Sequence, residues 1–242
     1  MHDINIFLIF SKYKFLFAYF FIVLFTNMQI NYKDWMALAN RVFGQEIVPV
    51  EAIFVHGFED LHDEMIDFVA DVYKKSGAKY VVLNGEKEFE FEAPGFAYWK
   101  EKLSERGVLE NLISGVTPAH QTREEAIGFM NFAKENNIKK GIVISAPTYV
   151  IRAFLTNLSL INEWKLDIDL YPMTMKDMDW RKEIVVRGLS NDSPSEPGPR
   201  FVKFAGEWGK IIQYRQIYEN GNANYSIASV KEGLEYLKKL SD

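Results

Sequence analysis

The sequence contains no cysteine, and this absence removes a large part of protein chemistry at once. Disulfides, thiolate nucleophiles, iron–sulfur clusters and zinc sites built on thiolates are all excluded. Basic residues are also scarce, with 28 lysines and arginines against 33 acidic residues and a formal net charge of −5. Because nucleic-acid binding needs a basic face to neutralise phosphates, we expect no nucleic-acid partner.

The overall composition is that of a folded globular chain. Its 242 residues are 48% hydrophobic and 25% charged, so it has enough apolar material for a buried core and too little net charge for wholesale disorder. This length fits one large domain or two small ones. The aromatic content of 15% is high, and it is unevenly distributed along the chain.

Nine aromatic residues lie within the first 27 positions, and the eleven residues 15–25 form an unbroken apolar run. This run is shorter than the roughly 20 residues that span a bilayer, and a longer span would include Lys12 and Lys14, which is costly. We interpret residues 1–27 as an apolar leader outside the functional protein, which then starts at Met28. The leader carries two lysines and one aspartate, so the net charge without it is −6. The alternative is an uncleaved membrane anchor over residues 4–25.

Residues 28–242 alternate between helical periodicity and short apolar runs that are typical of buried strands. The predicted helices cover residues 32–43, 60–75, 94–107, 122–136, 148–160, 201–220 and 226–240. The predicted strands cover residues 52–55, 80–83, 108–113, 141–144 and 166–171. Strands separated by helices predict right-handed crossovers and a parallel sheet. We expect a single α/β domain over residues 28–242, a three-layer Rossmann-like parallel sheet with C-terminal helices, in which residues 190–200 form a surface loop.

Ligands of open parallel sheets bind where strands end and helices begin, which selects the loops 56–60, 84–94, 117–122 and 145–148. The first loop contains potential metal ligands in His56, Asp60 and His62. Helix capping explains this loop better, with Asp60 as the N-cap and acidic residues at 63 and 64 in the first turn, so we expect no metal. These carboxylates repel phosphate and the loop lacks G-x-G-x-x-G, which favours a ribose hydroxyl or an amino group as its ligand.

The helix predicted from residue 122 begins with a capping pattern. Thr122 is suited to the N-cap position, and Glu124 and Glu125 follow as the carboxylates of a capping box. Capping explains the choice of these residues. It does not explain the polar loop just before them, which includes His120 and lies where a ligand would bind.

The loop after the strand predicted at 141–144 combines Ser145 and Thr148 with Arg152. Thr148 is suited to cap the next helix, and Arg152 lies one turn further along it. A helix N-terminus with an arginine makes an anion site, whereas an arginine that pairs with a surface acid makes none, and the sequence leaves both open. A serine hydrolase is a weaker alternative, because neither Ser114 nor Ser145 lies in a G-x-S-x-G nucleophile elbow.

Taken together, these loops resemble the YdcF/SanA-like family of domains of unknown function, most closely its cytoplasmic YdcF branch. The pattern comprises a strand and glycine turn at 52–57, Leu-Asn-Gly at 83–85, Gln-Thr-Arg-Glu-Glu-Ala at 121–126, and Ala-Pro-Thr at 146–148 followed by Arg152. The family usually has Asn-Thr-x-Glu-Asn-Ala in the third place, from which Gln121 and Glu125 depart. Many members have a histidine where this chain has Tyr149. The resemblance covers about residues 32–214.

The resemblance implies a Rossmann-like fold and a small nucleoside-type ligand, with S-adenosylmethionine as the candidate for the YdcF branch. We therefore predict a cytoplasmic protein of unknown activity that binds such a ligand at the carboxyl edge of the sheet. The predicted ligand-binding residues are Gly57, Asp60, Asn84, Gly85, Thr122, Glu124, Thr148 and Arg152, with His56, His120 and Ser145 as further candidates. Two alternatives remain: a membrane-anchored, SanA-like envelope factor held by residues 4–25, and a hydrolase that uses His56 or His120 as its base.

Overall fold

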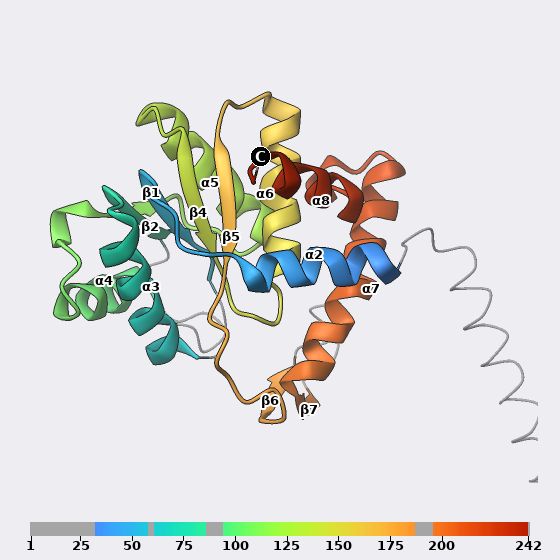
Figure 1. The fold of residues 1–242 in the computed structure, drawn as a ribbon, viewed down its shortest axis with the longest axis horizontal. Coiled ribbons are helices and arrows are strands. Elements are labelled where there is room, and N and C mark those ends of the chain that lie inside the picture. The colour runs from blue at the N-terminus through green and yellow to red at the C-terminus, as the bar shows by residue number, and fades with distance from the viewer. Residues whose placement is uncertain (1–31, 58–60, 86–93, 187–195, 242) are drawn as a thin grey trace, which may run out of the picture.

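The computed structural model describes residues 32–57, 61–85, 94–186 and 196–241, and its centre is a parallel sheet (Figure 1). The sheet has five strands, β1 (Ala52–Val55), β2 (Tyr80–Asn84), β3 (Ile113–Val116), β4 (Lys140–Ile144) and β5 (Asp169–Met173). They lie in the order β3-β2-β1-β4-β5, and every neighbouring pair is parallel. The predicted three-layer, Rossmann-like α/β fold is confirmed.

Helices cover both faces of the sheet (Figure 1). Alternate residues of a strand point to opposite faces, so Ile53 and Val55 of β1 pack with α3 (His62–Ser76) and α4 (Phe96–Glu105). Ala52 and Phe54 pack with α5 (Thr122–Glu135) and α6 (Val150–Trp164). Because both faces are buried, the strands read in the sequence as continuous apolar runs.

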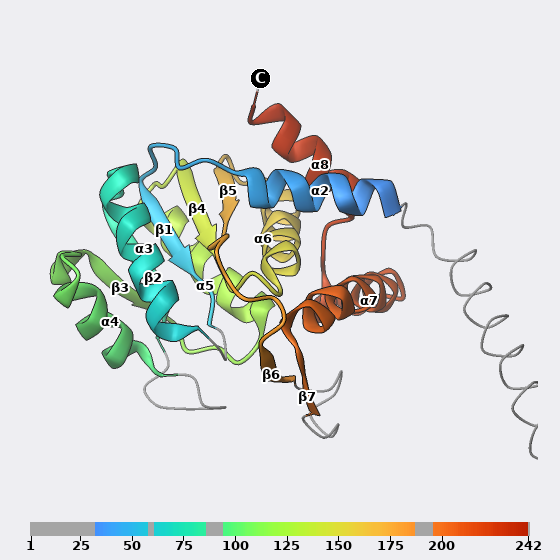
Figure 2. The ribbon, with the colours of Figure 1, turned by 60° about the horizontal axis from the view of Figure 1, so that its bottom comes forward.

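Three further helices pack beside α6, namely α2 (Tyr32–Gly44), α7 (Arg200–Glu219) and α8 (Val230–Lys239) (Figure 2). Trp35 of α2 stacks on Trp208 of α7, with the ring centroids 5.9 Å apart. Tyr236 of α8 reaches the edge strand, where its hydroxyl donates to the Ile168 carbonyl oxygen at 2.9 Å and accepts from the Leu170 N–H at 2.8 Å. Burial raises the pKa of Tyr236, so this hydroxyl stays a donor.

An antiparallel hairpin precedes α7, and its strands are β6 (Glu183–Val186) and β7 (Glu196–Pro199). The predicted surface loop at 190–200 therefore contains a strand from residue 196, and residues 190–195 lie outside the described residues. Helix α8 starts at Val230, four residues later than predicted, because Ser229 and Glu232 form a capping box there. Residues 223–225 form a short 3₁₀ turn instead.

The predicted strand at 108–113 is wrong. Residues 110–112 form a 3₁₀ turn, and β3 runs from Ile113 to Val116 through the Ser114-Gly115 pair that resembles a turn in the sequence. The glycine has a packing cause, since a Cβ added to Gly115 would lie 3.2 Å from the Phe96 ring of α4. Similarly, β5 lies at Asp169–Met173 rather than at 166–171.

Within the described residues, no helix combines the length and the apolar character needed to cross a bilayer. The leader and the alternative anchor at residues 4–25 lie outside the residues that the structure describes.

Candidate functional site

The order of the strands reverses between β1 and β4. From β1 the chain moves outward to β2 and β3, and then returns to the other side of β1 to form β4 and β5. The residues after β1 and β4 are therefore neighbours, and the His56 N–H donates to the Ile144 carbonyl oxygen at 2.9 Å. Open α/β sheets bind their ligands at such a switch point.

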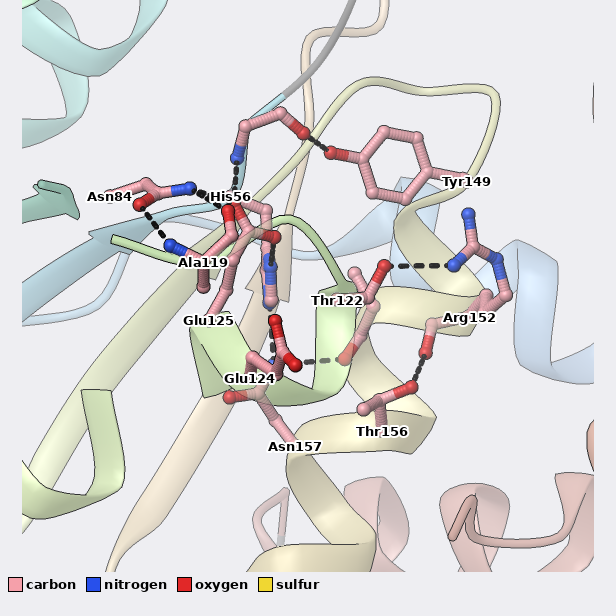
Figure 3. A network of polar contacts seen from close by, with 12 residues as sticks. His56, Asn84, Ala119, Thr122, Glu124, Glu125, Tyr149, Arg152, Thr156 and Asn157 are labelled. Carbon is pink, nitrogen blue, oxygen red and sulfur yellow. Dashed lines mark hydrogen bonds and ion pairs between the residues drawn. The ribbon is translucent and has the colours of Figure 1, made fainter. Parts of the chain in front are cut away.

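Glu125 of α5 is the centre of a polar network at this switch point (Figure 3). Its Oε2 lies 2.8 Å from Nδ1 of His56. Its Oε1 accepts from the Gly57 N–H at 2.8 Å and from Nδ2 of Asn84 at 3.1 Å. The side chain is buried. One carboxylate therefore joins the ends of β1 and β2 to the first turn of α5.

The neighbours of His56, which is fully buried, determine its tautomer. Nδ2 of Asn157 on α6 donates to the Ala153 carbonyl oxygen at 2.9 Å and lies 2.7 Å from Nε2 of His56. A carbonyl oxygen only accepts, so the Asn157 amide has one orientation and His56 Nε2 is an acceptor. Nδ1 therefore carries the hydrogen and donates to Glu125. Both ring nitrogens of His56 are occupied by protein partners.

Asn84 holds the loop that leads into α5. Its Nδ2 donates to the Ala119 carbonyl oxygen at 2.6 Å, and its Oδ1 accepts from the Ala119 N–H at 3.1 Å. The next residue, Gly85, passes so close to β3 that an added Cβ would lie 2.0 Å from the Val116 carbonyl oxygen. Both residues thus shape the backbone around the site.

Tyr149 connects the loop after β4 to the loop after β1. Its hydroxyl donates to the Gly57 carbonyl oxygen (Figure 3), and the guanidinium of Arg152 lies 5.2 Å from the centre of its ring, within range of a cation–π interaction. A Cβ added to Gly57 would lie 2.9 Å from Oε1 of Glu125. The absence of a side chain at residue 57 therefore permits the close approach of the Glu125 carboxylate to the loop after β1.

Arg152 pairs with a buried acid rather than with an acid on the surface. Its guanidinium forms an ion pair with Glu207 of α7 and donates to Oγ1 of Thr122 at 2.8 Å. Burial works to lower the pKa of Arg152, but Glu207 outweighs it and holds that pKa above its usual range. Burial works to raise the pKa of Glu207, but the charges of Arg152 and Lys210 outweigh it and hold that pKa below its usual range. The arginine is therefore charged and already compensated.

Two fully buried polar atoms at the switch point, Ser145 Oγ and Asn157 Oδ1, have no hydrogen-bond partner among the described residues. Ser145 follows β4 at the place where His56 follows β1. Its carbonyl oxygen accepts from Oγ1 of Thr174 at 2.7 Å. Buried polar atoms in folded proteins nearly always have a partner. An atom of a ligand or of water would satisfy these two groups.

The three predicted N-caps are wrong. Helix α5 starts after Gln121 and α6 after Tyr149, and neither residue makes a side-chain cap. The Thr122 hydroxyl is used by Arg152 instead, and Thr148 is buried in the turn before α6. The residue before α3 is Leu61, in a left-handed conformation, so Asp60 is not the cap, and Asp60 itself lies outside the described residues.

The other predicted site residues divide into those at the network and those away from it. Gly57, Asn84, His56 and Ser145 lie at the switch point. Glu124 is exposed, and its Oε2 accepts a long hydrogen bond of 3.3 Å from the His120 N–H. Where the chain is described, no group of three or more histidine, aspartate or glutamate side chains is arranged to hold a metal ion.

Sequence reasoning missed the residues that organise the site: Glu125, Asn157, Tyr149 and Glu207. Two of them carried a signal, because Glu125 and Tyr149 are positions at which the chain departs from the YdcF/SanA-like pattern. Asn157 lies in a helix that also contains Arg152, Thr156 and Ser159, so its polar side chain alone gave no distinct signal. Nothing in the sequence near Glu207 indicates its pairing with a residue 55 positions away.

No protein-family model, curated protein or solved structure matches this chain. Its function is therefore inferred from its own geometry.

Proposed function

We propose that the chain binds a small nucleoside-type ligand at the switch point between β1 and β4, and that S-adenosylmethionine is the first ligand to test. The observation that carries this proposal is the buried hydroxyl of Ser145, which has no partner among the described residues. It follows β4 at the carboxyl edge of the sheet, where open α/β folds bind ligands. The resemblance to the YdcF branch favours the same class of ligand.

The acidic residues around the switch point favour hydroxyl and amino groups over phosphates. Helix α3 has Asp63 and Glu64 in its first turn, and α5 has Glu124 and Glu125. Their negative charges oppose a polyphosphate that the positive ends of the helix dipoles would otherwise attract. A ligand with hydroxyl or cationic groups meets no such opposition.

Arg152 does not reverse this balance, because Glu207 already compensates its charge. S-adenosylmethionine suits the resulting potential, since it presents two ribose hydroxyls, an amino group and a positively charged sulfonium. It also has one carboxylate. The first turn of α6 contains no acidic residue, so this helix start can accept that carboxylate.

The alternative of a hydrolase with His56 as its base is disfavoured by the same contacts. A general base must reach the proton that it removes, at about 2.6–3.2 Å. Both nitrogens of His56 already have protein partners within 2.8 Å. We therefore assign His56 to the support of the site.

The first experiment is a thermal shift assay on the purified chain with S-adenosylmethionine and with ATP, each at millimolar concentration. At about 100 times the dissociation constant, binding adds roughly 2.7 kcal/mol of stability, which for a chain of this size is a shift of about 5–10 °C in Tm. We expect the shift with S-adenosylmethionine and a smaller one with ATP. If neither compound, nor adenosine, raises Tm, the proposal is wrong.

A variant pair locates the ligand. Ser145→Ala removes an unpaired buried hydroxyl, so the unliganded protein should be as stable as the wild type or slightly more stable, while its affinity for the ligand falls at least tenfold. Ser104→Ala, on α4, is the matched control, because that hydroxyl already donates to the Lys100 carbonyl oxygen. Equal affinity in the two variants would place the ligand elsewhere.

A further inference from the structure

The unpaired polar groups at the switch point are closed off from solvent. Ser145 and Asn157 are both fully buried, and Ser145 Oγ and Asn157 Oδ1 have no hydrogen-bond partner among the described residues. Phe54 of β1 and Val143 of β4 face α5 and α6. Because side chains alternate along a strand, His56 and Ser145, each two residues further on, face the same side. A ligand that satisfies these atoms therefore has to enter beneath α6, and part of the chain must first move.

The loop between β4 and α6 is anchored near both of its ends. At its start, the Ser145 carbonyl oxygen accepts from Oγ1 of Thr174 at 2.7 Å. Just beyond its end, Arg152 forms an ion pair with Glu207. Residues 146–149 lie between these two anchors, and residues 147–149 form a turn. Since hinges in proteins occur in loops and at the ends of helices and strands, residues 146–149 are the part of this loop that can move.

Tyr149 is the residue through which this loop reaches across the switch point. It immediately precedes α6, and its N–H donates to the Ala146 carbonyl oxygen at 3.0 Å. Its hydroxyl donates to the Gly57 carbonyl oxygen, as Figure 3 shows. This is a hydrogen bond between neutral groups, whereas Gly57 and Asn84 donate to the carboxylate of Glu125. Hydrogen bonds to a charged group are about twice as strong as neutral ones, so the Tyr149 bond opens more readily than those of Glu125.

The Gly57 carbonyl oxygen is an acceptor that a ligand can also use. Gly57 is exposed and follows β1 at the carboxyl edge of the sheet, where open α/β folds bind ligands. The Tyr149 hydroxyl gives this oxygen a donor of the same kind as a ribose hydroxyl. A hydroxyl or amino group of a ligand can therefore replace the hydrogen bond that is lost when Tyr149 moves away.

We infer that Tyr149 is a latch over the ligand site: its hydrogen bond to Gly57 holds residues 146–149 closed, and a ligand reaches Ser145 after this bond has opened. Arg152 stays in place during opening, because Glu207 and Thr122 hold its guanidinium. The inference deepens the proposed function and rests on it for the identity of the ligand. The latch itself belongs to the chain alone, so its opening can be measured with no ligand present.

Because the chain has no cysteine, Ser145→Cys introduces a single thiol at the buried position in the full-length protein. The rate at which iodoacetamide alkylates this thiol in native buffer, followed by mass spectrometry, measures how often the switch point opens. Tyr149→Phe in the same background keeps the ring and removes the hydroxyl. We expect it to raise the alkylation rate roughly fivefold, which is the change in population expected for the loss of one neutral hydrogen bond.

Tyr236→Phe is the matched control, because it also removes a tyrosine hydroxyl that donates to a backbone carbonyl oxygen, here at the amino end of β5. It destabilises the domain at the opposite edge of the sheet, so it accelerates alkylation only if the thiol reacts through global unfolding. An alkylation rate in Tyr149→Phe no higher than in Tyr236→Phe would overturn the latch. Circular dichroism shows that each variant is folded, and Thr148→Cys, at a second buried position of the same loop, replaces Ser145→Cys if that variant does not fold.

Ligand binding separates the latch from the proposed function. With Ser145 restored, the association rate constant for S-adenosylmethionine should rise roughly fivefold in Tyr149→Phe, because the open state is populated more. If alkylation is accelerated but neither protein binds S-adenosylmethionine, the latch is supported and the proposed ligand is wrong. If S-adenosylmethionine binds to the variant and to the wild type at the same rate, Tyr149 does not control entry and the inference is wrong.

Discussion

Replacement of Glu125 by glutamine tests the polar network with a change of a single side-chain oxygen to an amide nitrogen. Glu125 accepts from His56, Gly57 and Asn84. In the Glu125→Gln variant the amide oxygen can keep the bonds to Gly57 and Asn84, but the amide nitrogen faces Nδ1–H of His56. The ring cannot move its hydrogen to Nε2, because Asn157 presents a donor there. The variant therefore places two donors against each other in a buried site.

The expected loss of stability follows from these three bonds. A hydrogen bond to a charged group contributes about 1.5–3 kcal/mol and a neutral one about 1 kcal/mol. One bond is lost and two become neutral, which gives a loss of about 3 kcal/mol. Relief of the desolvation of the buried carboxylate offsets part of it, so about 2 kcal/mol remain. For a chain of this size that is a decrease of about 4–8 °C in Tm.

The assay is equilibrium unfolding in urea followed by circular dichroism, with Glu124→Gln as the matched control. Glu124 is the preceding residue on the same helix, but it is exposed, and its change should stay within about 0.5 kcal/mol. If Glu125→Gln is no less stable than Glu124→Gln, the three hydrogen bonds do not hold the switch point together, and the assigned tautomer of His56 is wrong.

Three further variants test the surrounding contacts. Glu207→Gln leaves the charge of Arg152 without its buried partner and should cost about 3 kcal/mol at pH 7 in urea unfolding. Folding lowers the pKa of Glu207 below 4.5, so its contribution to the free energy of unfolding is complete above pH 4.5 and is lost as the pH falls through the pKa of the folded state. If the difference in stability between the variant and the wild type does not narrow in acid, this pairing is wrong. Gly57→Ala places a Cβ 2.9 Å from Oε1 of Glu125, and we expect it to lower the free energy of unfolding by about 1–3 kcal/mol. In the double variant with Glu125→Gln the two losses should not add, because both changes disturb one network. In Gly85→Ala the added Cβ would lie 2.0 Å from the backbone of Val116, so this variant should lose more stability than Gly57→Ala. Equal losses in the two variants would mean that the end of β2 can shift.

The elements that the sequence predicts well are those whose pattern follows directly from their own burial. β1, β2 and β4 are continuous apolar runs because helices cover both sides of the sheet, and α5 shows the periodicity of one apolar stripe. The prediction of β3 was wrong because β3 is an edge strand whose glycine is required by the close approach of Phe96. A contact with a distant helix has no local signature, so nothing in the sequence indicates a glycine inside this strand.

The positions of the candidate residues in the fold were predicted better than their contacts. Strand ends identified Gly57, Asn84 and Ser145, because the carboxyl edge of a parallel sheet is a property of the topology. The role of Thr122 was wrong, because capping is a local rule and Arg152 competes for the same hydroxyl. The pairing of Arg152 with Glu207 depends on how α7 folds back over α6, and hydrogen bonds over such a separation leave no periodicity in the sequence.

If the resemblance to the YdcF/SanA-like family is used as a guide, two of the positions at which the chain differs from that pattern make contacts across the switch point. Glu125 stands where the family usually has asparagine, and its longer side chain accepts from groups at the ends of both β1 and β2. Tyr149 stands where many members have histidine, and its hydroxyl reaches the Gly57 carbonyl oxygen. An asparagine at 125 is one methylene shorter and presents a single acceptor oxygen, so it could not serve the three donors that Glu125 does. Both residues therefore help to hold the switch point together, which is also where the unpaired hydroxyl of Ser145 lies.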